Sequence, residues 1–130
     1  MGFTIYYTSV RPVTPEEAES IKATAQKYCE GRSWLSCEPV SFFPDLQDGI
    51  LMGGSKPNFR PHPKDKSAAE TSGLPDGKPG DLLDILASLS REHAVDWELM
   101  HDYGPIGFIR SGIIDAKTLA QIEAIAEVGL

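Results

Sequence analysis

The sequence has few cysteines, no long apolar run and no recognised secretory pattern. Its two cysteines, Cys29 and Cys37, are too few for a disulfide framework, and we expect both to be free thiols in a reducing compartment. No stretch approaches the roughly 20 apolar residues that a membrane span requires, and the first residues lack the basic start of a secretory signal. We therefore expect a cytoplasmic protein that makes no use of a membrane.

Common catalytic motifs are also missing. G-x-S-x-G, H-E-x-x-H, C-x-x-C and G-x-G-x-x-G do not occur, which removes the most easily recognised enzyme classes. Gly53-Gly54-Ser55-Lys56 differs from a phosphate-binding loop, in which the lysine precedes the Ser or Thr and a helix follows. No two of the 3 histidines have the spacing of a local metal pair. The sequence thus predicts no metal and no cofactor.

Positive charge is scarce relative to negative charge. The chain has 12 Lys and Arg against 19 Asp and Glu, a formal net charge of -7. An acidic surface repels phosphate backbones, so general nucleic-acid binding loses its main source of affinity. This charge suits a protein partner, a basic one in particular.

What the sequence does contain is the composition of one packed domain covering residues 1–130. Hydrophobic residues make up 41% of the chain, enough for a core. A helix is expected over 15–30, where Thr14 is a cap residue, Pro15 follows it and Glu17 completes a capping box. Apolar residues at helical spacing predict two more helices, one over 81–93 capped by Asp81 and one that begins at Asp115.

Alternating and β-branched segments predict the strands. The first covers 3–8, and short strands over 40–43 and 49–52 are expected to form a hairpin. A second hairpin joins 95–100 to 106–110. With the commonest short turn, Glu98 lies opposite Arg110 and Leu99 opposite Ile109.

The resulting order is β-α-β-β-α-β-β-α. Helices separated by hairpins favour an α+β two-layer sandwich with a mixed or antiparallel sheet of about five strands and three helices. The specific arrangement that we expect is a ferredoxin-like core with an extra hairpin strand and a C-terminal helix.

The Pro/Gly-rich loop expected at 53–80 is locally basic, with five Lys or Arg against three Asp or Glu. Such a loop can display cations to an anion or to an acidic patch. It can equally be a solvated connection with a short helix near 64–71, or it can fold back on the acidic surface of its own domain. The candidate binding residues are Lys56, Asn58, Arg60 and His62.

The candidate catalytic residues are His101, Asp102 and Arg110, at and near one strand end. A histidine beside a cleft can act as a general base, and a neighbouring carboxylate can raise its pKa. Adjacent strand residues point to opposite faces, however, so a purely structural role for His101 stays open. Cysteine catalysis is disfavoured because Glu38, next to Cys37, opposes a thiolate.

Aromatic residues provide the last feature. If helices cover one side of the sheet, the other side can expose an apolar surface for a partner or a second copy, although such residues are often covered instead. Its members would be Tyr6, Phe43, Met100 and Phe108. The leading hypothesis is a binding protein without catalysis that uses an acidic surface or this aromatic face. The alternative is a small enzyme or ligand-binding domain with His62, His101, Asp102 and Arg110 in a cleft.

Overall fold

Strand β1, Ile5–Ser9, lies inside an antiparallel sheet and follows the predicted alternation. Its odd-numbered residues are buried and its even-numbered residues are not. The computed structural model describes residues 4–57, 63–102 and 104–128. Five strands form the sheet in the order β2-β1-β3-β4-β5, with every neighbouring pair antiparallel. The other strands are β2 (Met52–Ser55), β3 (Trp97–His101), β4 (Gly104–Arg110) and β5 (Ile113–Ile114).

The helices are α1 (Pro15–Cys29), α2 (Pro63–Ser72), α3 (Pro79–His93) and α4 (Ala116–Val128). The capping box predicted for α1 is confirmed, with the Thr14 side chain bonded to the Glu17 N–H and the Glu17 side chain to the Thr14 N–H. The cap predicted for α3 is wrong by three residues. Lys78 is the N-cap, and the carboxylate of Asp81 accepts its N–H at 2.9 Å. Because Pro79 fits the first helical position, the helix begins before Asp81.

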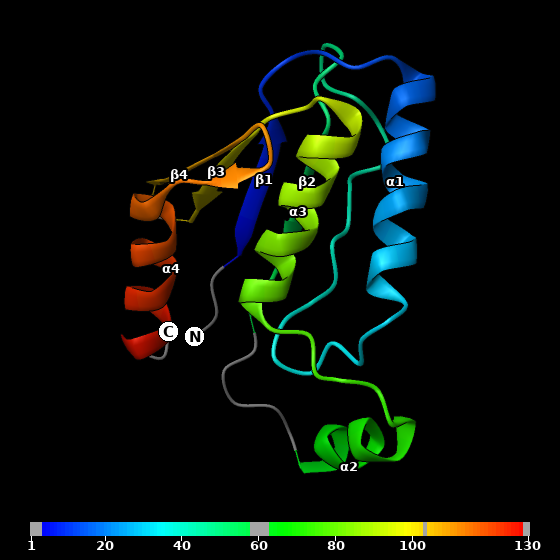
Figure 1. Cartoon of the computed structure of the whole chain (residues 1–130), viewed down its shortest axis with the longest axis vertical. Coiled ribbons are helices and arrows are strands. Elements are labelled where there is room, and N and C mark those ends of the chain that lie inside the picture. The colour runs from blue at the N-terminus through cyan, green and yellow to red at the C-terminus, as the bar shows by residue number, and fades with distance from the viewer. Residues whose placement is uncertain (1–3, 58–62, 103, 129–130) are drawn as a thin grey trace.

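Helices α1, α3 and α4 stand on the same side of the sheet, as Figure 1 shows. The indole N–H of Trp97 on β3 donates to the Leu86 carbonyl of α3 at 3.0 Å. On the same side, the rings of Tyr7, Phe42 and Trp97 pack with centroids 5.5 to 6.4 Å apart. Their aromatic contact adds to the burial energy of the core. The predicted α+β two-layer architecture is therefore confirmed.

The predicted first hairpin is wrong in its details. Residues 40–43 form no strand and reach β2 through the isolated bridge between Phe42 and Gly53. Pro39 and Pro44 flank this segment and lack the N–H that a continuous ladder needs. β2 begins at Met52 and follows α1 without a strand between them, so the predicted first strand of this hairpin is absent from the described residues. This order differs from the ferredoxin-like core.

The segment 53–80 is only partly the loop that its composition suggests. It begins in β2, contains α2 and ends in α3, and both Pro57 and Gly77 are buried. The predicted short helix near 64–71 is present as α2. Figure 1 shows α2 apart from the sheet and the other helices. Within the described residues, no helix is both long and apolar enough to cross a bilayer.

Candidate functional site

The side of the sheet opposite the helices is the candidate functional site, and we call it the open face. The strand pairings align its residues in cross-strand rows, of which one runs Tyr6–Met100–Pro105 and the next Thr8–Glu98–Phe108. Met52 pairs with Thr8, and Ile113 pairs with Arg110. Val10 follows β1 with the parity of Tyr6 and Thr8, and Phe43 follows Phe42, whose ring packs on the opposite side against Tyr7 and Trp97. The side chains of the open face are Tyr6, Thr8, Val10, Phe43, Met52, Glu98, Met100, Phe108, Arg110 and Ile113.

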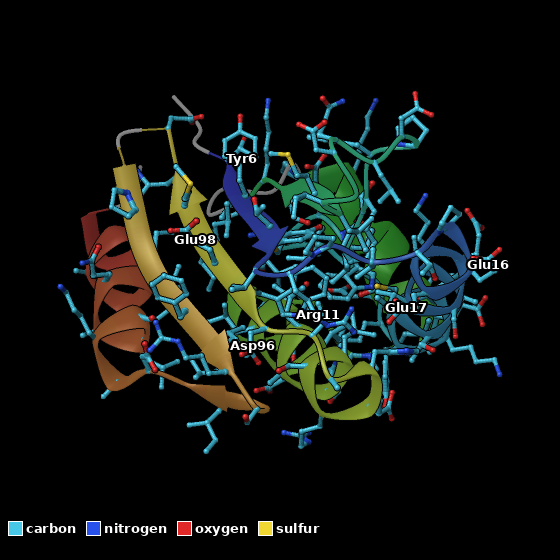
Figure 2. The ribbon with its side chains drawn as sticks, turned by 90° about the horizontal axis from the view of Figure 1, so that it is seen from above. Tyr6, Arg11, Glu16, Glu17, Asp96 and Glu98 are labelled. Carbon is cyan, nitrogen blue, oxygen red and sulfur yellow. The ribbon has the colours of Figure 1, made fainter. Side chains whose placement is uncertain are left out.

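Contacts of the helices show which side is covered. Gly107 on β4 pairs with the buried Leu99, and a Cβ added to Gly107 would lie 1.9 Å from Thr118 Oγ1 of α4. Helix α4 therefore packs on the same side as α3. In Figure 2, Tyr6 on β1 points away from α3, to the other side. The contact of Trp97 with α3 and the contact of Gly107 with α4 thus lie on the same side of the sheet, which we call the inner side.

Exposed apolar side chains gather on the open face. In the described part of the chain, seven large hydrophobic side chains are exposed, and four of them belong to the open face: Val10 (54%), Phe43 (44%), Met100 (38%) and Ile113 (67%). The inner-side neighbours Tyr7, Trp97, Leu99 and Ile109 are 0% exposed. A soluble chain rarely concentrates exposed apolar groups on one surface without a function for them.

Two charged side chains belong to the same surface. Glu98 is half-buried between Thr8 and Phe108 in its row. The guanidinium carbon of Arg110 lies 4.2 Å from the centroid of the Phe108 ring, in a cation–π contact. Within the described residues, neither Glu98 nor Arg110 forms an ion pair. One charge of each sign therefore accompanies the apolar groups.

The predicted register of the second hairpin is wrong by two residues. Glu98 pairs with Phe108 and Leu99 with Gly107, because β4 begins at Gly104, two residues earlier than predicted. A bulge at Ile106 shifts the ladder by one residue between Leu99 and Met100. A shift of two residues leaves every side chain on its expected face. Glu98 and Arg110 are therefore diagonal rather than directly opposed.

The predicted catalytic residues do not converge. His101 pairs with Gly104 at the start of β4, whereas Arg110 ends that strand, so the two are separated by roughly 20 Å at the usual rise per residue. Asp102 is exposed, and its carboxylate accepts the backbone N–H of Thr4 at 3.1 Å. In the described residues, no group of three potential metal-binding side chains is present.

Of the predicted binding residues, the structure describes Lys56. Its N–H donates to the Glu38 side chain at 2.8 Å and its carbonyl accepts the Glu38 N–H at 2.9 Å, while the lysine residue is exposed. Asn58, Arg60 and His62 lie outside the described residues. Their role in recognition stays a prediction.

Both cysteines are free and have a raised pKa. Burial, together with the negative charges of Glu38 and Asp76, raises the pKa of Cys37 to about 12. Burial also raises the pKa of Cys29. The thiolate that nucleophilic catalysis requires is therefore disfavoured at neutral pH in this fold.

A pocket of about 470 Å³ lies between α2 and the loop that follows α1, and it is lined by Ser33, Leu35, Ser36, Lys66, Glu70, Leu74 and Asp76. The carboxylate of Asp76 accepts the N–H groups of Leu35 and Ser36, both at 2.9 Å, and the Ser36 hydroxyl at 2.6 Å. Partial burial acts to raise the pKa of Asp76, but these hydrogen bonds outweigh it and the pKa is lowered. Asp76 is thus already engaged in fixing the loop.

No family model, curated protein or solved structure matches this chain. The open face is therefore identified from its geometry alone. The sequence predicted four of its members, Tyr6, Phe43, Met100 and Phe108, but not Val10 or Ile113. Continuing the period of two from Tyr6 would have found Val10. The Ser111-Gly112 pair is the sequence signal for Ile113, because it forms the short turn, with both residues at positive φ, that pairs Ile113 with Arg110.

Proposed function

We propose that this chain is a binding protein without catalytic activity that engages a protein partner through the open face. The observation that supports the proposal is the gathering of four exposed hydrophobic side chains on the side of the sheet opposite the helices. Covering them removes apolar surface from water, which favours association by about 25 cal/mol for each Å² buried. Thr8 and the two charged groups provide the polar contacts that fix orientation.

The alternative function, a small enzyme, has weaker support. An active site requires its acid, base and binding groups within reach of one substrate. His101 ends β3 and pairs with the first residue of β4, whereas Arg110 is the last residue of β4. Asp102 already bonds the backbone of Thr4. A cytoplasmic location belongs to the same proposal, and two free thiols are in keeping with a reducing compartment.

A partner attracted by the acidic surface is the second mode of binding, and salt distinguishes it. Interactions between exposed charges weaken as the Debye length falls from about 10 Å at 0.1 M salt to about 3 Å at 1 M. Apolar contacts do not weaken in this way. A complex that survives high salt therefore points to the open face.

Affinity capture from an extract of the native host tests the proposal. We expect the wild-type chain to retain a partner that the Met100→Arg variant loses, because the new cation must be buried unpaired in the interface. Leu119→Arg is the matched control, since Leu119 has a similar exposure of 40% but lies on α4. If Met100→Arg and Leu119→Arg retain the same proteins as the wild type, the open face is not the binding surface.

A further inference from the structure

The charges of the open face are balanced, although the chain as a whole is acidic. The chain has a net charge of -7, yet the charged strand residues of the open face are one carboxylate, Glu98, and one guanidinium, Arg110. The carboxylates that flank β3, Asp96 and Asp102, are bonded to the backbone N–H groups of Ser111 and Thr4. A strongly basic partner would bind the excess of acidic groups that lies outside the open face. A surface with one charge of each sign is instead complementary to a copy of itself.

We propose that the open face binds the open face of a second copy of this chain, with Glu98 of each copy facing Arg110 of the other. This inference rests on the proposed function and names the partner. In a symmetric dimer, a contact from one residue to another is always repeated with the two copies exchanged. The contact between Glu98 of one copy and Arg110 of the other therefore forms twice, and both charges of both copies are paired.

The sheet geometry permits the two pairs to form at the same time. Arg110 lies two residues beyond Phe108, the cross-strand partner of Glu98, so Glu98 and Arg110 are diagonal neighbours about 7–8 Å apart. Consider a two-fold axis that lies between the two sheets, parallel to them and perpendicular to the line from Glu98 to Arg110. This axis places Glu98 of each copy over Arg110 of the other copy. Two sheets packed in this way lie about 10 Å apart, with the apolar side chains between them.

The size of the surface sets the expected strength. The five strands have 5, 4, 5, 7 and 2 residues. At a spacing of about 4.8 Å they span on the order of 400 Å² on each copy, below the roughly 800 Å² per partner of a stable complex. The dimer therefore belongs with weak, reversible associations. Its detection requires a concentration series rather than a single measurement.

Sedimentation velocity over a series of chain concentrations tests this dimer. We expect the wild type to shift from monomer to dimer, and the variants Glu98→Arg and Arg110→Glu each to remain monomeric because each places like charges together. Mixing the two variants in equal amounts should restore the dimer, since every position 98 then meets an opposite charge at position 110. Asp84→Arg, an equal change of charge on the exposed side of α3, should dimerise like the wild type.

Each outcome decides the question. Failure of the wild type to associate at any concentration overturns the dimer, and so does a mixture of the two charge variants that stays monomeric while each remains folded by circular dichroism. If affinity capture nevertheless retains a different protein that Met100→Arg loses, the proposed function stands and the occupant of the open face is that protein. If the wild type and Met100→Arg retain the same proteins in affinity capture, the proposed function is wrong, whatever the result for the dimer.

Discussion

At the scale of single residues, the hydroxyl group of Tyr7 joins two segments of the chain that are distant in sequence. It donates to the Ser41 carbonyl at 2.9 Å and accepts the Ser41 N–H at 2.7 Å, and it lies 3.0 Å from Ser55 Oγ. Burial raises the pKa of Tyr7 to about 12, so the hydroxyl keeps its proton throughout the neutral range. This group holds residues 39–43 against the edge of the sheet.

Replacing Tyr7 by Phe should lower the free energy of unfolding by about 1–3 kcal/mol, because the Ser41 N–H loses its partner in a partly buried site. Urea denaturation measures the change. Tyr6→Phe is the matched control, because Tyr6 lies on the open face and its loss of a hydroxyl should change stability by less than about 0.5 kcal/mol. Equal effects of the two substitutions would contradict this role for Tyr7.

Cys37 makes the stability of the fold depend on pH in the alkaline range. Its ordinary pKa is 9.0 and burial raises the folded-state value to about 12, so between these values the unfolded chain has released a proton that the folded chain retains. The free energy of unfolding should therefore fall as the pH rises above 9. For one proton the slope approaches about 1.4 kcal/mol per pH unit. Cys37→Ala should reduce the slope of the unfolding free energy between pH 9 and 10 in urea titrations. An unchanged slope would show that Cys37 titrates normally in the fold.

Gly53 explains one error of sequence interpretation. Composition assigns Gly53 and Gly54 to a loop, yet both belong to β2. A Cβ on Gly53 would lie 2.2 Å from the Ser41 carbonyl oxygen and 2.5 Å from the Tyr7 ring. The glycine is needed because three segments approach closely here, and a close approach between distant segments leaves no periodic signal in the sequence.

At the scale of elements, β4 and α4 meet through a contact between Gly107 and Thr118. Thr118 is buried, and its hydroxyl has no hydrogen-bond partner among the described residues. A Cβ on Gly107 would lie 1.9 Å from this hydroxyl oxygen and 3.1 Å from Thr118 Cβ. The position of α4 on the inner side of the sheet thus depends on the absence of a side chain at Gly107.

Gly107→Ala should therefore lower the free energy of unfolding by about 1–3 kcal/mol through overpacking. Thr118→Ala removes the colliding oxygen, so the double variant should be more stable than the sum of the single changes implies. A double-mutant cycle in urea measures this coupling. Additive effects of the two substitutions would mean that Gly107 and Thr118 do not meet.

The elements also show what periodicity can and cannot predict. Helix α1 was predicted because its cap residues and its apolar spacing agree, and α3 and α4 were found from their apolar spacing. The register of β3 and β4 could not be predicted, because it depends on where the turn before Gly104 ends and on the extra residue Ile106 in β4, and neither has a periodic signal. Of the candidate site, the even positions on β1 and β3 were accessible to sequence reasoning. The edge residues Val10 and Ile113 depended on where the strands end.

At the scale of the whole molecule, the fold has a covered side and a side whose side chains are more exposed. Helices α1, α3 and α4 stand on one side of the sheet, and α2 lies away from it (Figure 1). The side chains facing the helices form one continuous core. The other side carries exposed apolar groups with one charge of each sign, and the proposed interface rests on this composition.

The most direct measurement of this claim is the broadening of methyl NMR signals by a soluble paramagnetic agent, in a dilute sample of the wild-type chain. The methyl groups of Met100 and Ile113 should broaden at least as strongly as those of Leu119, an exposed residue of α4, while the methyl groups of Leu99 and Ile109 should remain sharp. If Met100 and Ile113 are instead protected like Leu99, the open face is covered within the single chain and cannot serve as the binding surface.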